Sequence, residues 1–335
     1  MGFQNIKDKL KTPSTIVITT HFKPDGDALG SSLAMSHWLK QKGHEVQIIA
    51  PSDFPYFLDW LPGREEVIIY TEQKERSDQM IRDAAIIFCL DFNGLGRTQD
   101  MAPSLQAAEG TKIMIDHHLA PEGFDDERYW DSSAAATAEL VYKFIVHEFD
   151  DAASISPALA TCLYTGIMTD TGSFRFKSTT PEVHHIIADL IEKGAKNWEI
   201  HENIFNSNTE TRLRFLGFCL AHRLVVDPEH RTAWMAISKQ DLVDYSVGTG
   251  DTEGLVNYAL SIQGIQFAAL IIERQDIIKF SFRSIGDFPC NEFSSMHFNG
   301  GGHLNAAGGN AQGTLEEAVR KFKSLLPTYK NLLTQ

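Results

Sequence analysis

Cysteine is scarce in this chain. Its four copies, Cys89, Cys162, Cys219 and Cys290, lie far apart with no CxxC spacing, so neither a cysteine zinc site nor a disulfide framework is expected. Three of the four stand in apolar runs, which predicts buried free thiols. Free thiols are typical of a reducing compartment, and we therefore expect a cytoplasmic protein.

Long apolar runs are missing as well, although 43% of the residues are hydrophobic. No stretch approaches the roughly 20 apolar residues that cross a bilayer, so no membrane span is expected. Residues 1–14 have no apolar signal core and predict a polar helix that leads into the first strand. The Met1-Gly2 start is a poor match to a lipidation motif.

Positive charge is in deficit, because 30 Lys and Arg stand against 44 Asp and Glu and the formal net charge is -14. A protein that binds a long phosphate backbone needs a basic stripe, so long nucleic acid is not an expected partner. A short anionic substrate, held by metal ions and a few local Arg and His side chains, remains compatible with this charge. The chain also offers no GxSxG motif or Cys/His pair as a covalent nucleophile.

The first half of the chain alternates β-rich runs with helical periodicity, which predicts a parallel sheet with helices on both faces. Strands are predicted at 15–20, 45–50, 67–70, 84–91 and 112–116, and helices at 28–42, 134–149 and 157–168. The polar residues 196–214 carry no β signal and predict a helical linker. We therefore predict an α/β domain over 1–195, the linker over 196–214, and a smaller α/β domain over 215–335.

The second half predicts a mixed sheet. One hairpin is expected between 222–227 and 231–238, and another between 265–274 and 277–283 across Gln275-Asp276. A short helix is expected at 292–298, a glycine loop at 300–302, and a closing helix at 314–333. Three consecutive glycines are costly unless the backbone passes close to something, so we favour a ligand-contacting loop over a plain turn.

Acidic and imidazole residues gather at positions where strands are expected to end: His21, Asp25, Asp27, Asp91, Asp116, His117, His118 and Asp170. In an open α/β sheet these positions share one edge, where ligands bind. Carboxylates brought together without a cation repel each other, and a divalent metal resolves the conflict. Mixed Asp/His ligation suits Mn²⁺, Zn²⁺ or Fe²⁺ better than Ca²⁺.

A pair of metals is expected at this edge. Asp25 and Asp27 are two residues apart in a predicted loop, so each can face one of two ions about 3.5–4 Å apart, and Asp91 is placed to bridge them. Any one of these aspartates could equally be a helix N-cap or a turn residue. It is the whole set that predicts a two-metal phosphoesterase.

Three further sites in the sequence carry weaker signals. Gly30-Ser31-Ser32 could present backbone N–H groups to a phosphate or could be an ordinary start of a helix. Arg97 follows the bridging aspartate and could bind a phosphate or be a solvated surface arginine. Arg283 ends a β-rich run and offers a planar fork for bidentate phosphate binding.

The pattern HxxPDGDALGS over 21–31, LDFN around Asp91, Asp116-His117-His118, and GIMTDTGSFRF over 166–176 resembles the DHH phosphoesterase superfamily. The late GGGHLNAAG over 300–308, preceded by SFRS over 281–284, resembles its DHH-associated C-terminal domain. The matching motifs run from residue 21 to 309. The nearest subgroup is the NrnA-like bacterial oligoribonucleases and pAp phosphatases, which consist of these two domains.

The resemblance implies roles for named residues of this sequence. One Mn²⁺ would be held by His21, Asp25 and Asp91, and the second by Asp27, Asp91, His117 and Asp170, with Mg²⁺ or Co²⁺ as substitutes. Asp116 would orient its neighbouring histidine as metal-bound imidazoles require, and His118 would face the substrate phosphate. Arg97, Arg283, Ser284, Gly301, Gly302 and His303 would complete substrate binding, in a cleft between the two domains.

The resemblance further implies water attack that trims very short RNA to mononucleotides and converts 3′-phosphoadenosine 5′-phosphate (pAp) to AMP. Alternatives are a phosphodiesterase for signalling dinucleotides such as pApA or cyclic di-AMP, an exopolyphosphatase-like enzyme, and a catalytically silent nucleotide-binding protein. A pyrophosphatase is disfavoured by the GGGH-type second domain, and a RecJ-like exonuclease by the missing basic track. The preferred substrate, the polarity of attack and the physiological metal stay open, and a homodimer is a guess from base rates.

Overall fold

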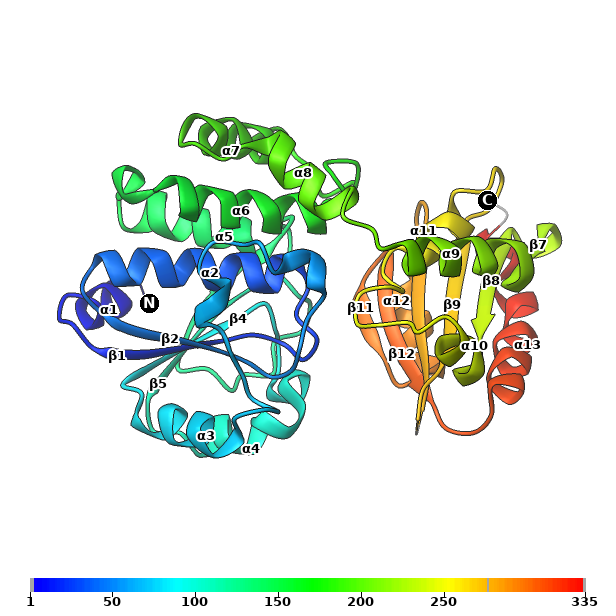
Figure 1. Cartoon of the computed structure of the whole chain (residues 1–335), viewed down its shortest axis with the longest axis horizontal. Helices are drawn as coiled ribbons and strands as arrows, with labels where there is room; N and C mark the ends of the chain where they lie inside the picture. The colour runs from blue at the N-terminus through cyan, green and yellow to red at the C-terminus, as the bar shows by residue number, and fades with distance from the viewer. Residues whose placement is uncertain (1–2, 276, 334–335) are drawn as a thin grey trace. The chain divides into compact units, whose positions relative to one another are not determined.

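The computed structural model of the chain describes residues 3–275 and 277–333. It divides into two compact units, which we describe separately: unit 1 ends at Ser207 and unit 2 begins at Asn208 (Figure 1). Asp276, in the turn of the second expected hairpin, lies outside the described residues. No helix within the described ranges combines the length and apolar character needed to span a bilayer.

Unit 1 is built on a parallel sheet of six strands, in the order β3-β2-β1-β4-β5-β6. The strands are β1 (Thr15–Thr19), β2 (Glu45–Ala50), β3 (Ile68–Ile69), β4 (Ile86–Leu90), β5 (Thr111–Asp116) and β6 (Glu127–Trp130). The apolar run of β4 is buried throughout, as expected for a strand covered on both faces. The direction of strand order changes between β1 and β4, which makes their shared carboxyl edge the topological switch point.

Helices cover both faces of this sheet, which confirms the predicted fold class (Figure 1). One face carries α2 (Gly26–Gln41), α5 (Thr137–Lys143) and α6 (Pro157–Asp170), and the other carries α3 (Lys74–Asp83) and α4 (Ala102–Ala107). The remaining helices of unit 1 are α1 (Phe3–Lys9), α7 (Pro181–Glu192) and α8 (Asn197–Phe205). The expected helix over 134–149 begins at Thr137 and continues as a π-helix over Phe144–Glu148. Short 3₁₀ segments span Tyr56–Leu58, Arg64–Glu66, Leu95–Met101 and Ala152–Ser154.

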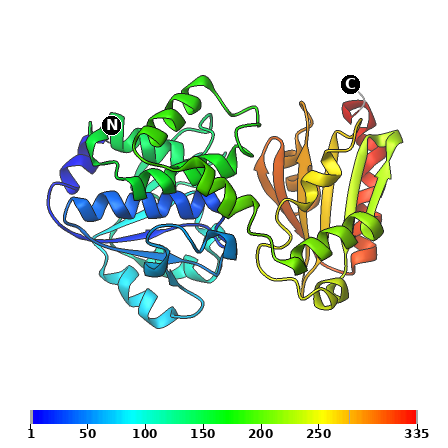
Figure 2. The same ribbon diagram turned by 45° about the horizontal axis from the view of Figure 1, so that its top comes forward.

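Unit 2 contains a mixed six-stranded sheet in the order β11-β12-β10-β9-β8-β7 (Figure 2). The strands are β7 (Leu224–Asp227), β8 (Thr232–Ile237), β9 (Phe267–Glu273), β10 (Ile278–Ser284), β11 (Gly301–His303) and β12 (Ala306–Ala311). Neighbours are antiparallel except for the parallel pair β8–β9. Both predicted hairpins, β7–β8 and β9–β10, are confirmed.

The two faces of this sheet pack against different helices. Phe280 and Phe282 of β10 enter a phenylalanine-rich core with Phe293 of α12 (Cys290–His297) and Phe322 of α13 (Leu315–Leu333). Alternate residues of β9 pack instead against α9 (Glu210–Phe218) and α11 (Leu255–Leu260). The unit also contains α10 (Lys239–Asp244), a π-helix over Cys219–Arg223 and a 3₁₀ turn over Pro228–His230. All four cysteines of the chain are free and buried, as predicted.

The glycine loop expected at 300–302 was wrong, because Gly301 and Gly302 belong to strand β11. A Cβ on Gly300 would lie 1.9 Å from the carbonyl oxygen of Gly308, and one on Gly302 would lie 2.5 Å from that of Ala306. Glycine is therefore required where these residues approach the backbone of β12. The close partner of the backbone is the neighbouring strand, which a sequence pattern alone could not distinguish from a ligand.

Candidate metal centre

The carboxyl ends of β1, β4 and β5 bring the predicted ligands of unit 1 together. These strands are neighbours in the sheet, so the residues that follow them, His21, Asp91 and His117, share the edge at the switch point. Two of the expected placements were wrong in detail. Asp27 stands in the first turn of α2 rather than in a loop, and Asp170 is the last residue of helix α6 rather than the end of a strand.

Asp25 both caps helix α2 and lies beside the candidate metal ligand His21. It is the N-cap of α2, and its Oδ1 accepts hydrogen bonds from the backbone N–H groups of Asp27 at 3.0 Å and Ala28 at 3.1 Å. The same Oδ1 lies 4.0 Å from Nε2 of His21. The N-cap reading of Asp25 and its membership of the cluster are therefore compatible, because a carboxylate has more lone pairs than the cap uses.

Asp91 lies between two groups of candidate ligands. Its Oδ2 is 3.4 Å from Nε2 of His21, and its Oδ1 is 3.6 Å from Nε2 of His117. One group comprises His21, Asp25 and Asp91, and a second comprises Asp27, Asp91 and His117, with the ligand atoms of each group within 4.8 Å of one another. Asp91 also lies within the same distance of Asp116 and His118. Asp91 is buried and has φ of 65°, a left-handed conformation that costs a non-glycine residue on the order of 1 kcal/mol.

Both candidate imidazoles direct Nε2 into the cluster. Nδ1 of His21 lies 3.0 Å from the carbonyl oxygen of Phe22, and Nδ1 of His117 lies 3.1 Å from that of Ala134. A carbonyl only accepts, so Nδ1 carries the proton in each ring and Nε2 keeps a lone pair. Nε2 of His117 also lies 3.8 Å from Asp27 Oδ2 and 3.4 Å from Asp170 Oδ2.

These side chains fit divalent metal ions. Atoms that bind one ion at about 2.1 Å lie at most about 4.2 Å apart, and every Nε2-to-carboxylate distance in the cluster falls below that limit. Carboxylate oxygens with imidazole nitrogens are a donor set that suits Mn²⁺, Fe²⁺ or Zn²⁺. Because the chain has one shared carboxylate and two flanking groups, the cluster could hold two ions.

Two carboxylates of the cluster are destabilised in their charged form, and a bound cation would stabilise them. Burial raises the pKa of Asp27 well above its usual value, and the charges of Asp91 and Asp170 add to the shift. Burial also raises the pKa of Asp170 to about 6, although His117 opposes this change. A metal ion placed among these groups would displace their protons and favour the charged carboxylates.

For Asp91, His21 and His117, neighbouring charges outweigh the effect of burial on the pKa. Burial would raise the pKa of Asp91, but the imidazoles of His21, His118 and His117 beside it hold the pKa below its usual value. Burial lowers the pKa of His21 and His117, yet the surrounding carboxylates outweigh it and raise the pKa of both rings. Asp91 therefore stays ionised more readily than Asp27 or Asp170.

Sequence reasoning missed the residues that hold Asp27 and Asp91 in place. The backbone N–H groups of Thr137 and Ala138 donate to Asp27 at 2.6 Å and 2.8 Å, and the Thr137 hydroxyl donates to Asp91 Oδ1 at 2.8 Å. Thr137 begins α5, so free backbone donors are present at this point. No local signal marked Thr137, because its partners are 46 and 110 residues away in the chain.

Replacing Thr137 with valine should weaken metal binding about 10- to 100-fold, the usual effect of removing a group that orients a metal ligand. Valine keeps the shape and the backbone donor to Asp27, but it removes the hydroxyl that fixes Asp91. Thr137→Ser retains the hydroxyl and should stay within about threefold of the parent. Titration calorimetry with Mn²⁺ measures the affinities, and equal affinities for the valine and serine variants would contradict this role.

Glycine allows α6 to approach α2 and the metal ligands. A Cβ on Gly166 would lie 2.6 Å from the Cβ of Ala138 and 2.9 Å from Asp27 Oδ1, and one on Gly30 would lie 2.6 Å from the carbonyl oxygen of Cys162. Gly30-Ser31-Ser32 thus belongs to this helix contact, with both serine hydroxyls donating to the carbonyl oxygen of Ala28, and does not form a phosphate loop.

Gly166→Ala should therefore displace Asp27 or separate the two helices, with a loss of about 1–3 kcal/mol in unfolding free energy and weaker metal binding. Gly217 is a matched control, because it is also helical and its added Cβ would meet nothing within 4 Å. Gly217→Ala should be neutral or stabilise by up to about 1 kcal/mol. Urea unfolding of both variants, with and without Mn²⁺, measures the difference.

Asp116, His118 and Arg97 form a second layer beside the cluster. Nδ1 of His118 lies 2.8 Å from Asp116 Oδ1, and Nη2 of Arg97 lies 3.4 Å from His118 Nε2. The expectation that Asp116 orients the metal-binding ring was wrong, since the ring it contacts is His118 and that of His117 is held by Ala134. Asp116 is fully buried, and its Oδ2 has no hydrogen-bond partner among the residues described.

Some of the predicted binding residues of unit 2 lie near one end of its sheet, and others are packed against the rest of the unit. Arg283 and His303 align with the same residue of β12, Ala306, so they lie near one end of the sheet. Ser284, another predicted binding residue, is engaged within unit 2. It lies on the buried face of β10, its hydroxyl donates to the carbonyl oxygen of Phe288 at 2.7 Å, and it accepts from Asn305 at 2.8 Å. An added Cβ on Gly301 would meet nothing within 4 Å, whereas Gly302 is held against β12.

Comparison with known proteins adds an independent finding. The family described as "DHH family, N-terminal domain" matches residues 15–167, and the "DHHA1 domain" matches residues 236–328. The "Bifunctional oligoribonuclease and PAP phosphatase NrnA" of Thermus thermophilus is 32% identical over 320 residues, covering 91% of this chain and 87% of that protein. The protein of the same name from Bacillus subtilis is 28% identical over 298 residues, covering 88% of each.

A solved structure is also similar over nearly the whole chain. The exopolyphosphatase-related protein from Bacteroides fragilis is 40% identical, with a TM-score of 0.93 and coverage of 99% of this chain and 97% of that one. The first family match contains His21, Asp91 and His117, and the second contains Arg283 and His303, whereas Asp170 lies three residues beyond the end of the first.

Proposed function

The chain belongs to the DHH–DHHA1 family of metal-dependent phosphoesterases, and from this membership we propose that it uses two Mn²⁺ ions to hydrolyse very short oligoribonucleotides and pAp. The observation that carries the proposal is the position of Asp91, which directs one carboxylate oxygen to each of two ligand groups. His21 and Asp25 would hold one ion with Asp91, and Asp27, His117 and Asp170 would hold the other.

Two bound ions would supply positive charge that polarises a phosphoryl group and activates water for in-line attack. The residues of the chain then position the substrate. Asp116 fixes the His118 ring by accepting from Nδ1, so that Nε2 faces Arg97. We assign the Arg97 guanidinium and His118 to the scissile phosphate, where a planar cation and an imidazole can stabilise the charge that develops in the transition state.

The choice of substrates rests on two supports. The relatives from Thermus thermophilus and Bacillus subtilis are named as enzymes for oligoribonucleotides and PAP, and their alignments cover most of both chains. The net charge of -14 also disfavours a long polyanion. Both proposed substrates combine a scissile phosphate with a second phosphate, and we assign the second one to Arg283 and His303, with Gly301 beside them.

A second candidate function is the removal of phosphate from polyphosphate chains. It is favoured by the likeness to the exopolyphosphatase-related protein from Bacteroides fragilis, at 40% identity over nearly the whole chain. Polyphosphate lacks a nucleoside, so an enzyme that hydrolyses it needs no binding site for a base or a ribose. Signalling dinucleotides such as pApA remain close to the main proposal, since they offer the same pair of phosphates.

A product time course distinguishes these substrates. The purified protein is incubated with labelled RNAs of two to twenty nucleotides, pAp, pApA and polyphosphate, with Mn²⁺, Mg²⁺ or Co²⁺ in turn. We expect Mn²⁺-dependent release of mononucleotides from the shortest RNAs and of AMP from pAp, with activity falling as the RNA lengthens. Rapid hydrolysis of polyphosphate alone would overturn the proposal in favour of the second candidate, and hydrolysis of none of them would overturn both.

A further inference from the structure

A groove with an excess of positive charge runs along strand β10 in unit 2. Residues 278–284 alternate between the two faces of the sheet, so Ile278, Phe280 and Phe282 are buried in the core. Lys279, Ser281 and Arg283 therefore share the opposite face. They line a cavity of about 130 Å³ together with Arg274, which follows β9. This volume equals that of about four water molecules at roughly 30 Å³ each, which is enough for a phosphate group.

The cations of this groove form a row. A strand rises about 3.4 Å per residue, so Arg283 and Lys279 are about 14 Å apart along β10. Arg274 comes next, at the β9–β10 hairpin, where its backbone N–H donates to the carbonyl oxygen of Ile277 at 2.9 Å. Arg274 is half-buried, and this burial lowers the pKa of its guanidinium. Cations spread over this length can each contact a different phosphate of an extended single strand, whereas one compact anion cannot reach all of them.

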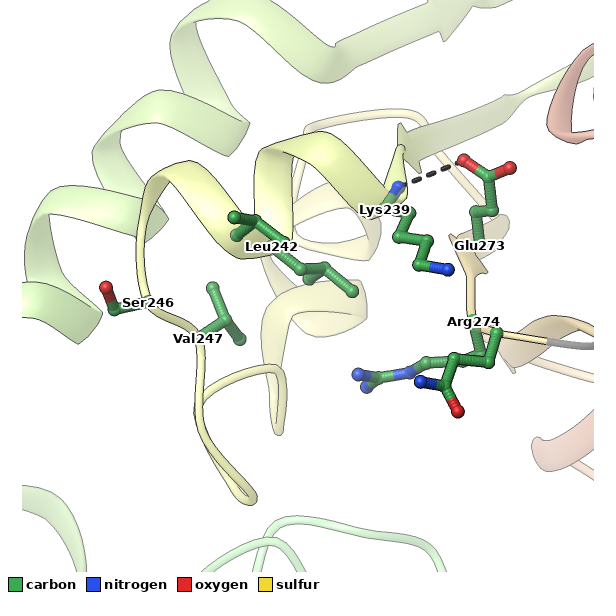
Figure 3. A pocket seen from close by; sticks show the side chains of 8 residues that line it. Lys239, Leu242, Ser246, Val247, Glu273 and Arg274 are labelled. Atoms are coloured by element: carbon green, nitrogen blue, oxygen red, sulfur yellow. Dashed lines mark hydrogen bonds between the residues drawn. The ribbon is translucent and has the colours of Figure 1, made fainter.

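The row continues into a second cavity of about 330 Å³, which Arg274 also lines. Figure 3 shows Arg274 near Lys239 and Glu273, with the aliphatic side chains of Leu242 and Val247 opposite them. The backbone N–H of Lys239 donates to the Glu273 carboxylate at 3.0 Å, which holds the wall of the cavity together. Aliphatic side chains beside a cation suit a nucleoside that follows a phosphate.

Charge is distributed so that a polyanion would favour this unit. Residues 208–335 contain 12 Lys and Arg against 13 Asp and Glu, whereas the whole chain has 30 against 44. Almost all of the net negative charge therefore belongs to unit 1. Unit 2 therefore repels a polyanion less than unit 1 does, and Glu253 is the one carboxylate among the described residues that line the groove on β10.

We propose that Lys279 and Arg274 bind the phosphates that an oligonucleotide carries beyond the one assigned to Arg283, so that this groove sets the preference for substrate length. The inference rests on the proposed function, since it takes Arg283 as the site of the second phosphate. A substrate with two phosphates, such as pAp, ends at Arg283. Only a longer oligonucleotide carries phosphates that can extend the roughly 14 Å from Arg283 to Lys279 and then reach Arg274.

The test compares two substrates on the same variants. We expect Lys279→Gln to lower kcat/KM for a five-nucleotide RNA about fivefold relative to kcat/KM for pAp, and the double variant with Arg274→Gln to lower this ratio at least about tenfold, mainly through KM. Glu253→Gln removes the opposing charge and should raise the ratio. Lys323→Gln is the matched control, because α13 carries Lys323 and packs on the other face of the sheet, and its ratio should equal that of the parent.

Binding supplies a readout that does not depend on turnover. Fluorescence anisotropy with a hydrolysis-resistant phosphorothioate pentanucleotide should show that Lys279→Gln reduces the salt slope by about 1, as expected for one lost phosphate contact. If the parent hydrolyses both substrates and the ratio and slope are unchanged in both variants, the groove is not a length-selecting site and the proposed function stands. If the parent hydrolyses neither substrate, the proposed function fails, and a salt slope that is also unaltered overturns the inference with it.

Discussion

Asp91→Asn is expected to lower kcat/KM for Mn²⁺-dependent hydrolysis of pAp by about 10³-fold or more. Metal ions supply several kcal/mol of transition-state stabilisation, and each 1.36 kcal/mol corresponds to a factor of ten in rate. Asp91 is the one residue that belongs to both ligand groups, so its loss disturbs both positions rather than one. Asparagine has nearly the same shape and can still accept from the Thr137 hydroxyl, which limits damage to the fold.

Metal binding should be lost together with activity. In the parent protein, Mn²⁺ at 100 times its Kd should raise the unfolding free energy by about 2.7 kcal/mol, because the ion binds only the folded state. Asp91→Asn should gain much less, and titration calorimetry should find fewer than two ions bound. Asp83→Asn is the matched control, since Asp83 is an exposed residue at the end of α3. A variant at Asp91 that binds two ions and turns over normally would refute the bridging role.

Arg283→Gln is expected to raise KM for pAp by about 10- to 100-fold while KM for bis-p-nitrophenyl phosphate changes less than about twofold. A hydrogen bond to a charged group contributes about 1.5–3 kcal/mol, and pAp has a second phosphate that the model diester lacks. Because Arg283 is assigned to that second phosphate, kcat for the diester should be unaffected. Arg283→Lys keeps the charge but not the planar fork, so its KM for pAp should lie between that of the parent protein and that of Arg283→Gln.

The controls for Arg283 separate binding from folding. The Arg283 side chain donates to the neighbouring carbonyl oxygen of Phe282 at 2.9 Å and contributes nothing to the phenylalanine core, so the variant should unfold at the parent's midpoint. Arg320→Gln makes the same chemical change at an exposed position on α13 and should leave KM for pAp unchanged. Equal increases in KM for pAp and the diester would show that Arg283 does not recognise the second phosphate.

The sheet of unit 1 was predictable because each strand is a short apolar run whose pattern is complete within a few residues. β2 has the bounds expected from the sequence, β1 and β5 differ by one residue at one end, and β4 begins two residues later and ends one residue earlier than expected. The edge strand β6 was missed, since Glu127–Trp130 alternates polar and aromatic residues and is only half-buried. Strands β11 and β12 were missed because glycine and alanine carry no β signal, although their small size is what lets the backbones approach.

The sequence by itself determined which residues could bind metal, because strand ends, residue types and the resemblance to a family all act locally along the chain. Only the tertiary structure decided how those residues are held. Asp27 accepts from residues 110 and 111 positions away, and Gly166 leaves space for it, because α5 and α6 pack against α2. Tertiary structure also decided that Asp116 contacts the ring of His118, and that the Ser284 side chain lies on the buried face of β10. Contacts between distant segments depend on how whole helices and strands pack, and no short stretch of sequence records that packing.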